Sequence, residues 1–320
     1  MALAAAGLLI ALLATGVGLY PVIHRVRDPR RRRLIAWLIA LGLLGLGWAL
    51  ARPLPPWGRL VVVWALTFAA FKALVLLHTP AEILRGLGWW RYCGFLAGWI
   101  GMDVESWTVA RAPVAAAGGR IRSGAAILAG GGLAAALLLG LALPERWRLA
   151  QAWCVWVLGV IAVFFGLTRL LAGLWNWWGR PVRPVFDQPV YARSLADWWG
   201  RRWNLAVHDT LAIAVWLPLR GRHGPPAWAA SGAVFLLSGL LHELLLSYPA
   251  GGGWGGPSAY FAIQAGGMFA ERRAGLRRIL RAATWRRAAW TLGVTLIPGP
   301  LLFHPPLLTA LVRPWLGWAT

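Results

Sequence analysis

Two polar segments interrupt an otherwise apolar sequence, and their side chains are the ones that could do chemistry. Residues 194–204 read Ser-Leu-Ala-Asp-Trp-Trp-Gly-Arg-Arg-Trp-Asn, and residues 238–244 read Ser-Gly-Leu-Leu-His-Glu-Leu. A charged side chain at the centre of a bilayer costs roughly 2.5–3.5 kcal/mol or more, so it persists mainly where it is paired or used. The adjacent His242 and Glu243 are therefore the first candidates for a functional site.

The chemistry that suits these residue types is acyl transfer to a hydroxyl group. A neutral imidazole is a suitable general base, because its ordinary pKa of about 6.5 lies near the working pH. His242 is the candidate base. An amide such as that of Asn204 can donate to a carbonyl oxygen as it becomes an oxyanion, or can orient the attacking hydroxyl.

The first segment is expected to form an amphipathic helix over residues 194–209. Ser194 is a suitable N-cap, and Asp197 lies in the first turn, where the helix dipole favours an acid. At about 100° per residue the polar side chains share one face, and the spacing predicts an ion pair between Asp197 and Arg201. An ordinary interfacial helix is the alternative. The polar face comprises Asp197, Arg201, Asn204 and His208, opposite Leu195, Trp198, Trp199 and Trp203.

The second segment places its polar and small residues on neighbouring faces of one helix. Ser238 and His242 share a face, and Gly239 and Glu243 form the adjacent stripe. Small residues allow a neighbouring helix to approach closely. A lone buried histidine is more often structural than catalytic, but an adjacent buried glutamate favours the catalytic interpretation. We expect Glu243 to hold the imidazole or to supply polarity, with Ser238 in support.

Composition describes a multi-pass membrane protein. Hydrophobic residues make up 59% of the chain, charged residues 13%, and the mean hydropathy is +0.61. The 24 tryptophans fit the two membrane interfaces. The net charge is +22, and nearly all of the basic residues are arginines, which fall in short loops between apolar runs. That distribution is typical of cytoplasmic loops and argues against a nucleic-acid partner.

Apolar runs of roughly 20 residues are long enough to cross a bilayer. We therefore expect an all-α, polytopic transmembrane bundle of about 8 to 10 helices, forming one integral membrane domain over residues 1–320, with N-terminal spans in 1–172 and a catalytic half in 173–320. Three segments are ambiguous: 86–101, 205–219 and 305–320. The candidate spans are 2–23, 34–51, 60–78, 124–143, 150–172, 228–248, 257–270 and 288–303.

The arginine loops predict the topology. Arg25–Arg33 is placed in the cytoplasm by the positive-inside rule, which puts the N-terminus outside. The basic loops within 79–123, 173–204 and 272–287 all fall in the cytoplasm only if residues 205–219 are partly inserted or re-entrant. Lys72 and Arg169 lie near the cytoplasmic ends of their spans, so we expect both to extend to the interface. The use of arginine in place of lysine, with abundant Ala, Gly and Pro, is typical of a GC-rich genome. We therefore expect a bacterial protein of the cytoplasmic membrane.

At these residues the sequence resembles the membrane-bound O-acyltransferase superfamily, in particular its wax synthase-like branch. The branch carries a Ser-Leu-x-Asp-Phe-Trp-Gly-Arg-Arg-Trp-Asn block, which residues 194–204 follow with Trp198 in place of Phe. The preceding Phe186-Asp187-Gln188-Pro189 is also similar, and residues 238–244 look like the intramembrane histidine segment of the family. The specific resemblance covers roughly residues 181–247.

The resemblance implies an acyl-CoA-dependent O-acyltransferase with His242 as catalytic base and Asn204 as its partner. The acceptor is a hydroxyl of a lipid or long-chain alcohol, as in a wax ester synthase, and acyl-CoA is a co-substrate rather than a cofactor. No metal is expected. Basic side chains are candidates for the CoA phosphates, although membrane topology alone also accounts for them. These arginines are Arg201, Arg202 and Arg193, with Arg180 and Arg183 less favoured, and Trp203 is a further candidate for acyl-CoA binding.

Alternatives remain open. His208 is a second possible base, with a structural or substrate-contact role as the other interpretation. A transporter or channel that uses His242 and Glu243 as a proton relay is a different class, but no inverted repeat is evident. A di-iron oxygenase needs clustered histidines, whereas the six in this chain are scattered. The acceptor, the acyl length and the oligomeric state are not specified by these patterns.

Overall fold

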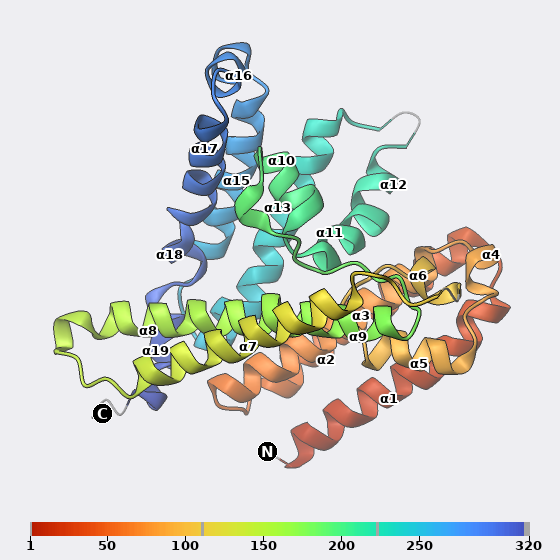
Figure 1. Cartoon of the computed structure of the whole chain (residues 1–320). Coiled ribbons are helices and arrows are strands. Elements are labelled where there is room, and N and C mark those ends of the chain that lie inside the picture. Colours follow the sequence, from red (N-terminus) through yellow and green to blue (C-terminus); the bar gives the residue numbers. More distant parts are fainter. Residues whose placement is uncertain (1, 110–111, 222–223, 317–320) are drawn as a thin grey trace. The chain divides into compact units, whose positions relative to one another are not determined.

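The computed structural model describes residues 2–109, 112–221 and 224–316, and within these ranges the chain forms helices and turns without a strand (Figure 1). Among the described residues, six helices are long and apolar enough to cross a membrane, and a bent pair, 284–302 and 305–311, adds a seventh if its two helices count as one span. The expected all-α transmembrane architecture is confirmed. The six are Ala4–Arg25, Pro29–Ala51, Pro56–His78, Ala117–Leu139, Glu145–Trp177 and Ala227–Ala250.

Two helices in the second half, where membrane insertion was expected, fall short of a straight crossing. Leu205–Leu219 is one of them, and α15 (Gly256–Glu271) has 16 residues. A straight crossing of about 30 Å needs roughly 20 residues at 1.5 Å per residue. The length of Leu205–Leu219 agrees with its expected partial insertion, whereas α15 is shorter than the span expected over 257–270 requires.

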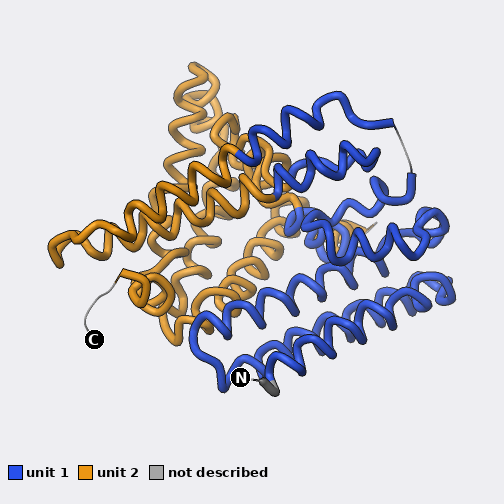
Figure 2. Tube along the Cα trace, turned by 60° about the horizontal axis from the view of Figure 1, so that its bottom comes forward, with its two compact units in different colours: residues 1–125, 168–184, 206–215 blue, residues 126–167, 185–205, 216–320 orange. Residues whose placement is uncertain are grey.

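The chain divides into two compact units that alternate along the sequence (Figure 2). Unit 1 comprises residues 1–125, 168–184 and 206–215, and unit 2 comprises residues 126–167, 185–205 and 216–320. The helices of unit 1 are α1 (Ala2–Arg25), α2 (Pro29–Ala51), α3 (Pro56–His78), α4 (Ala81–Leu84), α5 (Trp89–Ala97), α6 (Glu105–Thr108), the start of α7 (Ala117–Leu139), α9 (Thr168–Trp177) and most of α11 (Leu205–Leu211).

Unit 2 contains the rest of α7 and the C-terminal helices. Its elements are α8 (Glu145–Val160), the π-helical turn η1 (Ile161–Leu167), α10 (Leu195–Asp197), α12 (Leu217–Leu219), α13 (Ala227–His242), α14 (Tyr248–Ala250), α15, α16 (Ala274–Arg281), α17 (Thr284–Leu296), α18 (Gly299–Leu302) and α19 (Pro305–Leu311).

A buried arginine joins the helix ends of unit 1. Arg32 is only 2% exposed, and its guanidinium donates to the carbonyl oxygens of Ile23, Leu76, Leu77 and others at the ends of α1 and α3. The last carbonyls of a helix lack partners within that helix, so one planar cation satisfies several at once. Arg32 therefore has a structural role beyond the topology that its loop predicts.

Lys72 contradicts the expectation that it extends to the interface. Its side chain is 1% exposed, and Nζ donates to the carbonyl of Gly101 at 2.8 Å. The same Nζ lies 3.6 Å from the ring centroid of Phe95, which supplies a cation–π contact. A nearby carbonyl and an aromatic face thus take the place of the water that we expected Lys72 to reach.

Close packing of α13 on α15 forms the centre of unit 2. A Cβ added at Gly239 would lie 3.0 Å from the Cα of Ser258, so the predicted small-residue stripe does bring two helices together. Farther along α15, a Cβ at Gly267 would lie 2.7 Å from Leu195 of α10. Helix α15 therefore contacts both polar segments of the sequence.

Candidate active site

The first polar segment begins as expected and then departs from a regular helix. Ser194 caps α10, since its hydroxyl accepts from the amide of Asp197 at 3.0 Å. The next turn, η3 (Trp198–Arg202), is π-helical, and the amide of Trp203 donates to the carbonyl of Trp198 at 2.8 Å. Asn204 follows with a φ of 44°, and α11 begins at Leu205.

The prediction of a continuous helix over residues 194–209 is therefore wrong, and so is the predicted ion pair between Asp197 and Arg201. A π-helical turn rotates less per residue than an α-helix. The residue five positions after Asp197, Arg202, therefore comes closer to the face of Asp197. The carboxylate of Asp197 accepts from Nε of Arg202 at 3.0 Å, and Arg201 is exposed instead. The left-handed residue at Asn204 then breaks the face that was expected to include His208.

The bend at Asn204 is held by the loop before the block. The amide of Leu205 donates to the carbonyl of Val185 at 2.9 Å, and the amide of Asp187 donates to the carbonyl of Arg202 at 2.8 Å. Trp203 packs edge-on against Phe186 with ring centroids 5.2 Å apart. Asparagine tolerates a positive φ better than most residues. The amide side chain of Asn204 therefore projects from a bend fixed on both sides.

His242 is held in one tautomer. Its Nδ1 lies 2.7 Å from the carbonyl oxygen of Ser238, and a carbonyl can only accept, so Nδ1 carries the proton. Nε2 is then the unprotonated nitrogen and the one that can take a proton. The ring also packs against Phe261 of α15, with centroids 4.6 Å apart. Ser238 thus contributes its main-chain carbonyl rather than its hydroxyl.

Glu243 holds α15 rather than the imidazole. It opens another π-helical turn, η5 (Glu243–Ser247), and its Oε1 accepts from the amides of Gly255 and Ser258 at 3.1 and 3.0 Å and from the Ser258 hydroxyl at 2.8 Å. Carboxylates are favoured at helix N-termini. Its Oε2 is buried and lacks a hydrogen-bond partner among the described residues. The expected contact with His242 is replaced by an anchor at the start of α15.

Aromatic side chains bring the two polar segments together within unit 2. Trp199 of the first segment contacts Phe235 of α13 at 5.8 Å and Phe261 of α15 at 5.7 Å between centroids. Its indole Nε1 donates to the side-chain oxygen of Gln264 at 3.3 Å. Because Phe261 also packs on His242, one ring of α15 touches both segments.

A basic pocket of about 530 Å³ lies beside the first segment, also within unit 2. It includes the predicted Arg193, Arg201 and Arg202, and α16 and α17 add arginines that we had attributed to topology alone. Glu271, whose Oε1 accepts from the amide of Leu195 at 2.9 Å, lines it too. The lining residues are Arg193, Ser194, Asp197, Arg201, Arg202, Glu271, Arg277, Leu280, Arg281 and Arg287.

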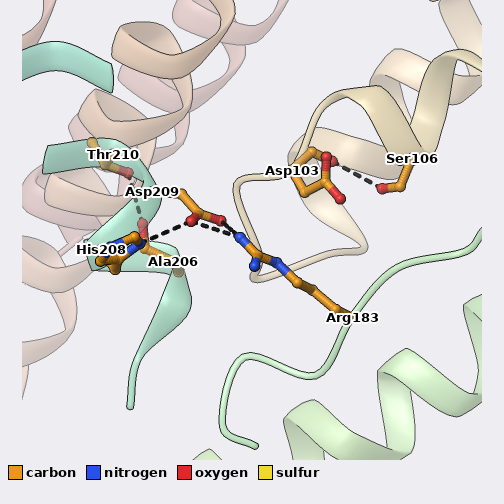
Figure 3. Close-up of polar contacts among 7 residues, drawn as sticks. All are labelled: Asp103, Ser106, Arg183, Ala206, His208, Asp209 and Thr210. Carbon is orange, nitrogen blue, oxygen red and sulfur yellow. Dashed lines mark hydrogen bonds and ion pairs between the residues drawn. The ribbon is translucent and has the colours of Figure 1, made fainter. Parts of the chain in front are cut away.

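The remaining predicted residues lie in unit 1 and have other partners. Nη2 of Arg183 donates to both carboxylate oxygens of Asp209 at 2.7 Å, and Nδ1 of His208 lies 3.1 Å from the same carboxylate (Figure 3). Arg180 donates to the carbonyl of Val109 at 2.8 Å. Arg183 and Asp209 line a pocket of about 200 Å³ with Asp103, and burial raises the pKa of the Asp103 carboxyl. These contacts give Arg180 and Arg183 structural partners.

Comparison with known proteins places the site in a matched segment. Residues 182–263 match the family model described as "Membrane bound O-acyl transferase family". This range includes the whole of the first polar segment, His242, Glu243 and Phe261. Among the described residues, no group of three or more His, Cys, Asp or Glu side chains is arranged to hold a metal ion.

Three curated plant proteins illustrate the similarity. "Long-chain-alcohol O-fatty-acyltransferase" of Simmondsia chinensis is 41% identical over 76 residues, 22% of each chain. "Probable long-chain-alcohol O-fatty-acyltransferase 2" of Arabidopsis thaliana is 32% identical over 164 residues, 47% of this chain and 44% of the relative. "Acyl-CoA--sterol O-acyltransferase 1" of Arabidopsis thaliana is 40% identical over 73 residues, 21% of each chain. The matches thus span less than half the length of these relatives.

Proposed function

We propose, from the match of residues 182–263 to the membrane bound O-acyl transferase family, that this protein is a wax synthase-like member of that family. In this proposal it transfers an acyl group from acyl-CoA to the hydroxyl of a long-chain alcohol or related lipid. The observation that carries the proposal is the His242 ring, whose Nδ1 faces a carbonyl and whose Nε2 is therefore free to accept a proton.

The reaction needs no covalent acyl-enzyme. Nε2 of His242 takes the proton of the acceptor hydroxyl as its oxygen attacks the thioester carbonyl carbon. The resulting tetrahedral oxyanion accepts a hydrogen bond from the Asn204 amide. When the C–S bond breaks, the CoA thiolate leaves and takes the proton from the imidazolium. The products are an ester and free CoA, and His242 returns to its starting state.

The basic pocket suits the CoA end of the donor. Arg193, Arg201, Arg277 and Arg281 are exposed there, and guanidinium groups bind phosphates in a bidentate geometry. Arg202 is already paired with Asp197, so its main task is to hold the block together. Trp203 packs against Trp198 and Phe186, which gives it a supporting role rather than the direct donor contact that we expected.

The acceptor is proposed to be an apolar alcohol. The names of the relatives give long-chain alcohols for two of them and a sterol for the third. Each of these acceptors is a hydrophobic molecule with one hydroxyl, which can reach a histidine in an apolar helix from within the bilayer. We further propose the cytoplasmic membrane of a bacterium as the location, with the N-terminus outside, from the arginine loops and composition.

Purified protein tested with labelled acyl-CoA and a panel of fatty alcohols, sterols and diacylglycerol would decide the proposal. Ester formation with an alcohol acceptor that depends on His242 is the expected result. His78 provides a matched control, because its Nδ1 lies 2.8 Å from the carbonyl four residues earlier in α3. Absence of ester with every acceptor, or the same loss in H78A as in H242A, would overturn the proposal.

A further inference from the structure

An uninterrupted basic segment connects α15 to α17. Residues 272–287 contain seven arginines and no acidic residue. The segment includes the whole of α16, and Figure 1 shows α16 at the tip of the hairpin that α15 and α17 form. With eight residues, α16 is far too short to cross a bilayer. The seven arginines are Arg272, Arg273, Arg277, Arg278, Arg281, Arg286 and Arg287.

Apolar side chains accompany these arginines at the surface. The Ile279 side chain is 55% exposed and that of Trp285 is 68% exposed. Ile279 lies on the side of α16 opposite Arg277 and Arg281 at the helical spacing. A short helix with one basic and one apolar side lies in the plane of a membrane interface, where tryptophan is also favoured.

The arginines form two sets. Arg277, Arg281 and Arg287 line the basic pocket assigned above to the donor. Arg272, Arg273, Arg278 and Arg286 lie outside that pocket and are exposed, and we name these four the outer arginines. None of the outer arginines takes part in the ion pairs observed within residues 2–109, 112–221 and 224–316.

Two of the outer arginines are held beside aromatic rings. The Arg273 guanidinium lies 4.8 Å from the Phe269 ring centroid, and that of Arg286 lies 5.5 Å from the ring of Trp285. A guanidinium stacked on an aromatic ring keeps its outward N–H donors available. The arrangement therefore presents positive charge and apolar anchors on one short element.

We propose that the outer arginines, with Ile279 and Trp285, form a binding surface for anionic phospholipid headgroups. In this proposal Ile279 and Trp285 enter the boundary between the headgroups and the acyl chains, while the guanidinium groups bind the phosphates. The segment has no acidic residue, so its positive charge is complementary to an anionic lipid surface. This surface goes beyond the proposed acyl transfer and does not depend on it, because lipid binding requires neither His242 nor the donor pocket.

A site-specific quenching measurement tests the surface on the full chain in nanodiscs. In a background with C93S and C154S, I279C carries a bimane label, and doxyl-labelled phosphatidylglycerol or doxyl-labelled phosphatidylcholine is added at equal mole fraction to phosphatidylcholine. We expect several-fold stronger quenching by the anionic lipid. The preference should weaken at about 1 M salt, where the Debye length falls to about 3 Å.

Variants of the outer arginines separate charge from folding. Replacing all four with glutamine should bring the two lipids to equal quenching, while replacing all four with lysine should keep the preference. Equal quenching by both lipids in the parent protein would overturn the proposal. So would a preference that survives in the glutamine variant, or a label that neither lipid quenches, which is the result for a surface covered by another copy of the chain.

Discussion

Helix α3 in unit 1 and α13 with its following turn in unit 2 both carry ionisable side chains inside apolar helices, and they use them differently. In α3, Lys72 is satisfied by a carbonyl and an aromatic ring, and Nε2 of His78 is buried with no hydrogen-bond partner in the part of the chain that the structure describes. In α13, the Nδ1 of His242 makes the same contact with the carbonyl four residues earlier as His78 does. The local hydrogen bond alone therefore does not mark a catalytic histidine.

The difference lies in the backbone after each histidine. Helix α3 ends at His78, whereas α13 continues into the π-helical turn that sends Glu243 to the start of α15. The anchored α15 then places Phe261 in contact with both His242 and Trp199. Nε2 of His242 is not among the buried atoms that lack a partner, unlike that of His78. A second element beside the imidazole is what distinguishes the two regions.

The largest expected effect comes from exchanging the two histidines for alanine. H242A should lower kcat by about 10²–10⁴-fold, the usual contribution of a general base. H78A should leave kcat within a few-fold, because its Nε2 reaches neither substrate nor solvent. Steady-state kinetics with acyl-CoA and a long-chain alcohol measure both. A comparable fall in both variants would remove the distinction between the regions.

The next effect concerns Glu243. E243A leaves the amides of Gly255 and Ser258 without their acceptor, at about 1–3 kcal/mol for a buried hydrogen-bonding group, and should lower Tm. E243Q keeps an acceptor oxygen and should retain most of the Tm and of the turnover. Thermal unfolding in detergent, paired with kcat, gives the comparison. An E243Q protein with normal Tm and lost turnover would instead make Glu243 a direct partner of His242.

A smaller effect separates two neighbouring arginines. R201Q should raise KM for acyl-CoA about five-fold, equivalent to about 1 kcal/mol for a charge-assisted contact, without changing Tm. R202Q should lower Tm, because it breaks the pair with Asp197 and the contacts with the carbonyls of Asp187 and Gln188. If R201Q lowers Tm and R202Q changes only KM, their assigned roles are exchanged.

The smallest effect is expected at Lys72. Replacing a buried charge with an apolar residue of similar volume is often neutral or stabilising. K72M should therefore keep kcat and Tm close to those of the parent protein. A large loss of turnover in well-folded K72M would show that the charge in α3 serves the reaction, and the contrast between the two regions would fail.

Periodicity predicted much of this architecture. Six of the expected spans, the Ser194 cap and the close approach at Gly239 all follow from apolar length, residue type and spacing. The π-helical turns η3 and η5 did not follow, because an i→i+5 turn leaves no mark in a pattern read at about 100° per residue. Because of these turns, Asp197 pairs with Arg202 instead of Arg201, and Glu243 contacts the start of α15 instead of His242.

The roles of the charged residues could also not be predicted from the sequence. A basic loop has the same pattern whether its arginines set topology, as expected for 272–287, or line a pocket, as Arg277 and Arg281 do. The carbonyls of Leu76 and Gly101, which accept from Arg32 and Lys72, lie far away in the sequence, so no local pattern reveals the burial of either side chain. The resemblance located the candidate catalytic segments, and the tertiary contacts then assigned the partners of their side chains.

The central claim is that Asn204 and His242 act on the same reaction step, and a double-mutant cycle tests it most directly. N204G removes the amide while tolerating the positive φ at this position, and H242A removes the base. Turnover is measured for both single variants and for the double variant. We predict that the double variant loses little more kcat than H242A alone; losses that multiply would show that the two residues act independently and would contradict a shared site.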